Sequence, residues 1–391
     1  MKKYLFKYIV LLLITTLFVP MVSSAVVYPM GRAYSGDKTV STTVTEDSTK
    51  SAINLLSNSG FASTTVASAS GFNAGNYILL VQMSGTGKGN YEVQKIQSIS
   101  SNTLFFYESL VSTYQSSGAQ VIKINEYNNV TVTASGSWQA SAWNGTTGGV
   151  LVALINGTFT QSAASASTTV ASQGFGGGAG ASNPPGGTPG SGSGSGGGGG
   201  SGTGASGSGA CGGGGGGHVA SGGNGGTYAL CTGPAGTGGG TYGGVTLASG
   251  NMQLGSGGGG GYGINLTGGS GGSGGGTILL FANKFSISGG VFAANGGAGQ
   301  STNGPGGGGS GGSLRLLPFT SLALGTSVVT SSGGAAGTGD ASAGGGANGR
   351  IATNVSATVT GTASPTIDTS STDIVRPKDS EALMMNLASS I

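Results

Sequence analysis

Two copies of one pattern decide the fold of this chain: GGGTILLFANKFSISGGVFAANGGAG at residues 274–299 and GGSLRLLPFTSLALGTSVVTSSGGAAG at residues 311–337. A weaker copy, ANGRIATNVSATVTGTASPTI, begins at Ala347, and an earlier one, VLVALINGTFTQSAASASTTVASQGFGGG, begins at Val150. The strand-like runs of the last three copies start 36 and 37 residues apart. Each copy combines short β-type runs with a glycine-rich excursion, which is typical of a repeat architecture.

Such a unit cannot bury its apolar side chains alone, whereas stacked copies can. Short strands separated by small residues therefore predict an all-β chain whose repeats form a parallel β-solenoid. In that fold the apolar residues of successive copies lie above one another as buried ladders. The inward ladders are expected at Ile278, Leu280, Leu314, Leu316 and Ile351. The glycine-rich excursions would then all leave the solenoid from one corner.

Glycine dominates these excursions, as in SGSGSGGGGGSGTGASGSGACGGGGGGHVASGGNGG at residues 191–226. Neighbouring excursions could pack as polyglycine II strands, which have three residues per turn and bond to one another because they cannot bond internally. They could equally be solvated flexible loops. GGSGGSGGG at 268–276 has a period of three, but GSGSGSG at 190–196 has a period of two. Apolar residues inside the tracts favour packing: Tyr228, Leu230, Val245, Met252 and Tyr262.

The first 25 residues resemble a secretory signal peptide. Lys2, Lys3 and Lys7 precede an apolar run from Ile9 to Val19, which is too short to span a bilayer, and Ser23-Ser24-Ala25 is a small-residue cleavage site. We expect cleavage after Ala25 and a secreted or cell-surface protein without a membrane span; an uncleaved anchor is the alternative. The 14 basic and 11 acidic residues of the whole chain become equal once the three lysines are removed. A neutral mature chain gives no reason to expect nucleic-acid binding.

The two cysteines, Cys211 and Cys231, both lie in the glycine-rich part of the chain. Export and an even count favour a disulfide between them. The alternatives are two free thiols or a bond to another chain.

Composition changes along the chain indicate four parts. Residues 1–25 are the signal peptide, and 26–127, with strand-like runs separated by turn residues, are expected to form a small β-barrel or sandwich. Residues 128–365 are the expected solenoid domain, and 366–391 are a C-terminal tail. The SGTGKGN segment within 71–127 lacks the Gly-Lys-Ser/Thr ending of a phosphate loop and is interpreted as a hairpin turn.

Candidate catalytic residues are scarce. Asp340 is the only carboxylate between Glu126 and Asp368, whereas polysaccharide hydrolases need at least an acid and a base. His218 is the only histidine, and a metal site requires several ligands. The sequence therefore assigns no catalytic, metal or cofactor-binding residue, and His218 is interpreted as a surface residue or a hydrogen-bonding plug.

Trp138 and Trp143 are the only tryptophans, and they lie six residues and one residue before the turn segment NGTTGG. They could fill a core, or they could form an exposed pair that stacks on sugars. A regular ladder of exposed threonines, which an ice-binding face would need, is not visible in the sequence.

The order of several blocks resembles a known family. These blocks are the stretch from NYILLVQM to NNVTV, then WNGTTGGVLVALINGTFT, then GSGGGGGYG and GGSGGSGGGTILLFANKFSISGGVFAANGGAG. They are similar to the glycine-rich secreted surface proteins of gliding bacteria, including those labelled adventurous gliding motility proteins. The resemblance covers roughly residues 72–350 and implies export and association with the cell surface or matrix, without catalytic residues. We therefore expect a structural or adhesive protein whose partners are other surface components, glycans or further copies of itself. The second hypothesis is a module that binds a specific receptor or ligand, including ice. The third is an exported carbohydrate-active enzyme.

Overall fold

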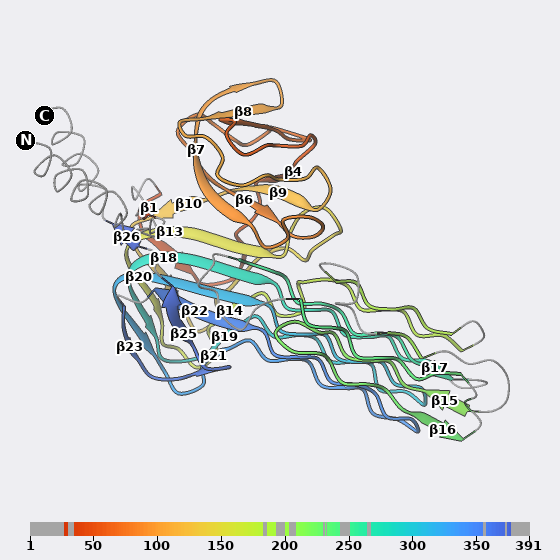
Figure 1. Cartoon of the computed structure of the whole chain (residues 1–391). Helices are drawn as coiled ribbons and strands as arrows, with labels where there is room; N and C mark the ends of the chain where they lie inside the picture. Colours follow the sequence, from red (N-terminus) through yellow and green to blue (C-terminus); the bar gives the residue numbers. More distant parts are fainter. Residues whose placement is uncertain are drawn as a thin grey trace, which may run out of the picture.

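The computed structural model describes residues 27–29, 35–182, 186–192, 200–202, 209–229, 231, 233–242, 251–263, 267–354, 357–371 and 374–376. The described residues form strands, turns and extended segments and contain no helix, so the all-β expectation is confirmed. Three parts are visible in Figure 1: a solenoid of stacked parallel strands, a small barrel above it, and a long array of glycine-rich segments projecting from one side. The expected signal peptide lies outside the described residues.

The solenoid is built from two parallel sheets, and the chain alternates between them. The first sheet has the order β2 (Lys38–Val40), β11 (Val130–Val132), β13 (Val150–Gln161), β18 (Thr277–Ile287), β20 (Ser313–Leu324), β22 (Arg350–Asn354) and β25 (Asp368–Ser371), with β10 (Asn125–Tyr127) beside β13 and β23 (Thr358–Thr360) beside β20. The second has the order β3 (Thr43–Thr45), β12 (Ser137–Gln139), β14 (Ser167–Thr169), β19 (Val291–Ala293), β21 (Val329–Thr330) and β24 (Ala363–Ser364). Each turn of the chain therefore adds one strand to each sheet.

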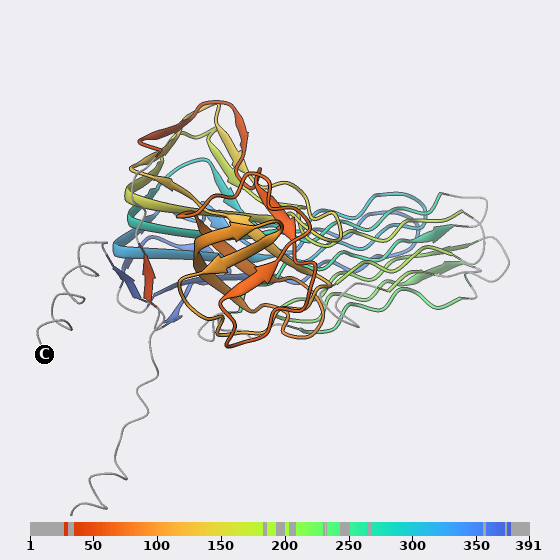
Figure 2. The same ribbon diagram turned by 90° about the horizontal axis from the view of Figure 1, so that it is seen from above.

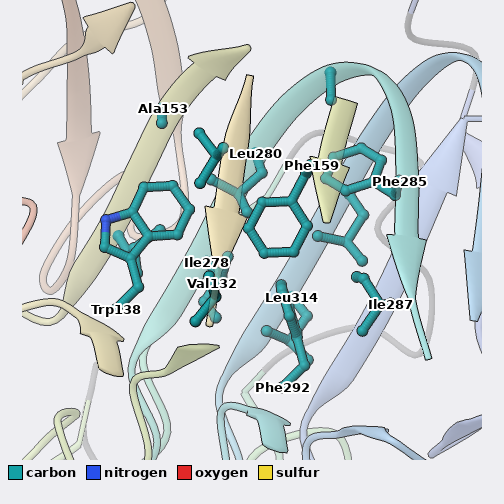
Figure 3. Packing of buried hydrophobic residues seen from close by; sticks show 14 of the residues in the cluster. Val132, Trp138, Ala153, Phe159, Ile278, Leu280, Phe285, Ile287, Phe292 and Leu314 are labelled. Atoms are coloured by element: carbon teal, nitrogen blue, oxygen red, sulfur yellow. The ribbon is translucent and has the colours of Figure 1, made fainter. Parts of the chain in front are cut away.

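The expected ladders are confirmed by the register of the first sheet. Ile278 pairs with Leu314, which pairs with Ile351, and Leu280 pairs with Leu316. All five side chains are buried in one apolar cluster between the two sheets. Figure 3 shows part of this interior, where Ile278, Leu280 and Leu314 lie beside the rings of the second sheet and of β13. Burial of these ladders is the main apolar contribution to solenoid stability.

The small domain is a closed six-stranded barrel. Its strands pair antiparallel in the order β4-β9-β6-β7-β8-β5. They are β4 (Lys50–Ala52), β5 (Ser63–Thr65), β6 (Tyr77–Gln82), β7 (Tyr91–Ser100), β8 (Thr103–Phe106) and β9 (Ala119–Lys123). The ring closes because Ile53 forms an antiparallel bridge with Val66, and the amide of Asn54 donates to the carbonyl of Thr65. Closure leaves no free sheet edge. Of the two expected forms, the structure thus shows a barrel.

The expected boundary between barrel and solenoid differs from the observed one. Residues 38–40 and 43–45, which we assigned to the small domain, pair in parallel with β11 and β12 and form the first turn of the solenoid. The barrel is therefore an insertion between the first and second turns. At the other end, β25 pairs with β22, so residues 368–371 belong to the solenoid and not to a separate tail. Three-residue strands that pair across about 90 positions leave no local pattern in the sequence.

A second apolar cluster joins the barrel to the solenoid. Alternate residues of the central strands point out of the solenoid, and Leu279 and Leu317 are buried there against barrel residues such as Leu79 and Ile122. Both faces of β13, β18 and β20 are covered, so their first halves are buried throughout and mainly apolar, with Arg315 of β20 as the buried charged exception. The barrel is thus fixed on the solenoid by a shared core.

Candidate functional surfaces

The glycine-rich excursions form a lattice in which the main chains bond directly to one another. Five successive amides in the run of glycines after Cys211 donate to three different neighbouring segments in rotation. They are Gly212 to Gly226 O (2.9 Å), Gly213 to Pro305 O (2.9 Å), Gly214 to Gly200 O (2.9 Å), Gly215 to Gly223 O (2.8 Å) and Gly216 to Gly308 O (2.8 Å). Amides three positions apart therefore donate to the same segment. This threefold rotation is the packing of polyglycine II, so the packed alternative is correct for the described segments and the flexible one is wrong.

The same three-residue step recurs between other pairs of segments. For example, the amides of Gly255, Gly258 and Gly261 donate to Gly275, Gly272 and Gly269 at 2.8 Å each. Sequences with serine enter the lattice as well as runs of glycine: the amide of Ser191 donates to the carbonyl of Gly176, and Ser256 and Ser310 are buried within the lattice. Of the period-two stretch GSGSGSG, Ser191 bonds to the lattice, and residues 193–196 lie outside the described ones.

Glycine is needed here because a Cβ would not fit, and not because of its backbone angles. A Cβ on Gly258 would collide with the carbonyl oxygen of Gly307, and one on Gly307 would collide with the carbonyl of Gly214. Among the described residues between 174 and 276, Gly186 is the only glycine with a positive φ. By contrast, Gly176 has no neighbour within 4 Å of its Cβ position. Close approach of main chains, as in collagen, thus explains the composition.

The excursions leave the solenoid at one corner, as expected. Residues 294–312 and 331–349 each leave after a strand of the second sheet and return to a strand of the first sheet. Figures 1 and 2 show the resulting array extending away from the two sheets and the barrel. The segment 251–263 has a contour length of roughly 40 Å at the polyglycine rise of about 3.1 Å per residue. The lattice is therefore a slab that projects from a compact body.

The far end of this slab changes from polyglycine to a short antiparallel sheet. It consists of β16 (Thr227–Ala229), β15 (Gly209–Cys211) and β17 (Tyr262–Gly263) in that order. Cys211 and Cys231 are joined by a disulfide, with their Cα atoms 6.0 Å apart, so the favoured pairing is confirmed. Tyr228 presents an exposed ring between the two cysteines along the chain. The disulfide therefore joins the end of β15 to the chain that follows β16 and closes the excursion between them.

His218 lies at the base of the slab and is fully buried, so its interpretation as a surface residue is wrong. Its ring is 5.0 Å from that of Tyr242, and neither ring nitrogen has a hydrogen-bond partner among the described residues. Burial, and secondarily the charge of Arg350, lowers the pKa of His218 well below its ordinary value. The imidazole is therefore a neutral space-filling group at the junction of slab and solenoid.

The two tryptophans do not form an exposed pair. Trp138 is fully buried in the solenoid interior, stacked on Phe159 with ring centroids 5.9 Å apart, so a surface contact through Trp138 is wrong. The physical reason is its place on β12, where the central residue of each three-residue strand points inward. Trp143 is half-buried and meets Phe175 edge-on at 6.0 Å. Its use as a surface contact stays a prediction.

Groups able to do acid–base chemistry are not gathered together in the described residues. Asp340 is exposed and accepts a 2.8 Å hydrogen bond from Asn303. The described residues contain no group of three or more His, Cys, Asp or Glu side chains that could hold a metal ion. A cavity of about 310 Å³, lined by residues including Ser35, Lys123 and Glu126, lies where the barrel joins the solenoid. It has no pair of facing carboxylates.

A column of side chains on the outer solenoid surface, five of whose six members carry hydroxyl groups, was not predicted from the sequence. It follows the register of the first sheet through Thr39, Thr131, Thr160, Ser286, Ala323 and Thr360. Four members are threonines, and every member is at least partly exposed. Ser286 and Ala323 interrupt the threonines, so the column is not a regular ladder of one residue type along its whole length. Most consecutive members are far apart in the chain: the barrel separates Thr39 from Thr131, and glycine-rich segments separate the members from Thr160 onward.

Comparison with known proteins yields distant likenesses alone. No family model and no curated protein matches the sequence. Among solved structures, the tailspike gp61 of Pseudomonas phage phi297 matches with 13% identity and a TM-score of 0.19 over 35% of this chain and 22% of that one. The Gp54 tailspike of Acinetobacter baumannii bacteriophage AP22, solved with a capsular saccharide, matches with 9% identity and a TM-score of 0.19 over 38% of this chain and 31% of that one. Both scores are too low to support an argument about function.

No helix in the part of the chain that the structure describes is long and apolar enough to cross a membrane. The disulfide is the structural feature that bears on location, because such bonds persist in oxidising compartments.

Proposed function

We propose that this protein is a secreted, non-catalytic structural or adhesive component of a cell surface or extracellular matrix. The observation that supports the proposal is the hydrogen-bonded polyglycine slab. In it, the main chains of segments far apart in the sequence are joined by a repeating pattern of amide–carbonyl bonds. A flexible linker needs no such lattice, and a catalytic site needs side chains that the slab lacks.

Order in the slab is thermodynamically demanding, which favours a mechanical role for it. Glycine loses more backbone entropy on ordering than any other residue. The dense network of bonds and the disulfide at its outer end offset that cost. A chain that needed only separation between two sites could use solvated glycine and serine. Stiffness and shape are therefore what the packed slab adds.

The slab presents an almost uncharged surface. Its described segments between residues 174 and 276 contain no Lys, Arg, Asp or Glu. Such a surface suits weak contacts with neutral neighbours, such as glycans, that gain strength when many copies act together. The proposed partners are accordingly other surface or matrix components.

The test uses the mature, oxidised protein coupled to beads and applied to bacterial cells and immobilised polysaccharides. Gly258→Ala, which places a Cβ against the Gly307 carbonyl, is compared with Gly176→Ala, whose Cβ has free space. We expect retention of wild-type and Gly176→Ala beads, and at least tenfold weaker retention of Gly258→Ala beads. Equal retention of all three would contradict a role for the ordered slab. Shortening of the polysaccharides by the wild type, abolished in Asp340→Asn, would instead support the carbohydrate-active alternative.

A second candidate function is recognition of a repetitive neutral ligand by the hydroxyl column. It is favoured by the regular stacking of Thr39, Thr131 and Thr160, because adjacent strands are about 4.8 Å apart and present equivalent groups at that interval. Ice and linear polysaccharides are repetitive ligands of this kind. Inhibition of ice recrystallisation, or polysaccharide binding, that is lost in Thr131→Lys but kept in Gly258→Ala would favour this surface over the slab.

A further inference from the structure

Large exposed apolar side chains are concentrated at one end of the barrel. Nine such residues occur in the described part of the chain, and six of them lie in two short segments, 55–61 and 105–111. They are Leu55 (59% exposed), Leu56 (51%), Phe61 (62%), Phe105 (38%), Tyr107 (61%) and Val111 (81%). We call these six residues the barrel patch. Concentration of this kind marks an interaction surface, whereas single exposed apolar residues do not.

The two segments of the barrel patch are held together by the barrel's own hydrogen bonds. The amide of Leu110 donates to the carbonyl of Phe61 at 2.9 Å, and the hydroxyl of Ser59 donates to the carbonyl of Val111 at 2.8 Å. Ser63 is the register partner of Phe105 in the pairing of β5 with β8. The patch is therefore one preformed surface.

The barrel does not need these side chains for its own core. Leu104, Phe106 and Leu110 point inward and are buried, whereas their neighbours Phe105 and Val111 point outward. A polar residue at each outward position would be compatible with the same strand pattern. The exposed residues thus mark a contact that the isolated chain does not make.

We propose that the barrel patch is a self-association surface that binds the same patch of a second copy of this chain. The exposed parts of the six side chains amount to roughly 700 Å², taking about 150–250 Å² as the full area of each. A standard interface buries about 800 Å² on each partner. The patch is therefore of the size that one stable pairwise contact requires.

The charges at the barrel patch favour a second copy over an unrelated partner. Glu108 lies within the patch segment, and the ammonium group of Lys95 lies 5.6 Å from the centroid of the Tyr107 ring. In a twofold contact each residue meets the equivalent surface in reverse, so residue i of one copy faces residue j of the other. The carboxylate of Glu92, which accepts hydrogen bonds from the amides of Val111 and Ser112, adds a second negative charge at the patch. In the proposed twofold contact Glu108 of each copy faces Lys95 of the other, which joins opposite charges across the interface.

Analytical ultracentrifugation of the mature, oxidised protein over a concentration series tests the proposal. We expect a monomer–dimer equilibrium in the wild type. The double variant Tyr107→Glu/Val111→Asp should raise the dissociation constant at least a hundredfold. Val291→Asp, at a comparably exposed apolar position on the solenoid, should leave it unchanged. Circular dichroism confirms that each variant is folded.

A charge swap distinguishes the proposed twofold contact from non-specific hydrophobic association. Glu108→Lys and Lys95→Glu should each weaken dimerisation, whereas the double variant should recover most of the wild-type affinity. The proposal would be overturned if the wild type stays monomeric at 100 μM protein. It would also be overturned if neither the patch variant nor the charge-swap variants change the dissociation constant of the dimer. The dimer measurement is independent of the adhesion assay, so the failure of one does not imply the failure of the other.

Discussion

The indole Nε1 of Trp138 donates a 2.7 Å hydrogen bond to Oε2 of Glu46, which lies 92 residues earlier in the chain. The other oxygen of this carboxylate accepts bonds from the Tyr127 hydroxyl at 2.8 Å and the Asn125 amide at 2.7 Å. Glu46 is buried, so this cluster ties the first turn of the solenoid to the second across the inserted barrel. Satisfied hydrogen bonds make its burial tolerable.

The pH dependence of stability should report on Glu46. Burial raises its pKa above the ordinary value, although the three hydrogen bonds act in the opposite direction. Because the folded state holds the proton more tightly than the unfolded state, the contribution of Glu46 is greatest at low pH. It falls as pH rises through the folded-state pKa. We therefore expect the difference in unfolding free energy between wild type and Glu46→Gln to become smaller from pH 4 to pH 7, measured by denaturant titration. A difference that grows over this range would contradict the prediction.

The two tryptophans should differ strongly in their structural importance. Trp138→Ala removes a fully buried ring and its bond to Glu46, so it should cost about 3–5 kcal/mol of stability. Trp143→Ala should cost about 2 kcal/mol or less, because its ring is half-buried and its main aromatic contact is Phe175. Thermal unfolding followed by circular dichroism measures both. Similar losses in the two variants would show that the solenoid interior is not organised around Trp138.

The effect of replacing a lattice glycine by alanine on the stability of the slab should depend on the position of that glycine. Gly258→Ala should destabilise the slab by about 1–3 kcal/mol or more, because neither main chain can retreat without breaking its bonds to other neighbours. Gly176→Ala should be neutral or stabilising by about 0.4–1 kcal/mol, through lower entropy of the unfolded chain. Hydrogen exchange of the amides at 254–261 measures the effect directly. Equal exchange rates in both variants would mean that the close approach of main chains does not restrict which residues fit in the lattice.

Removal of the disulfide should loosen the outer end of the slab. The Cys211→Ser/Cys231→Ser double variant releases a loop of 20 residues and should cost about 2–4 kcal/mol of local stability. We expect faster proteolysis within residues 200–242, with unchanged protection of β18 and β20, when cleavage sites are mapped by mass spectrometry. Unchanged cleavage of the oxidised protein and the variant would show that the lattice alone holds this end in place.

The solenoid could be recognised from sequence because its defining pattern is regular and repeated. Three copies with nearly equal spacing placed Ile278, Leu314 and Ile351 in one ladder, and the pairing of β18, β20 and β22 is as expected. The first turn of the solenoid was not predicted, because its strands do not repeat at that spacing. Thr39 and Thr131 are register partners, but the barrel separates them in the chain, so no spacing rule connects them.

From the sequence, a packed lattice and a flexible linker remained two alternatives for the glycine segments, because both have the same composition. What distinguishes them is whether neighbouring main chains meet, as Gly258 and Gly307 do. That proximity depends on the corner from which each excursion leaves the solenoid. It is therefore a consequence of the stacked turns.

By itself, the sequence determined the β character of the chain, the stacking of its repeats, the pairing of its two cysteines as the favoured choice, and the scarcity of catalytic groups. These are consequences of local periodicity and composition. Only the tertiary structure decided where the barrel is inserted, that the slab is ordered, and that the segments carrying the exposed residues Phe61 and Val111 lie side by side. Such features arise from contacts between residues far apart in the chain, whose register is set by how whole turns of the solenoid stack.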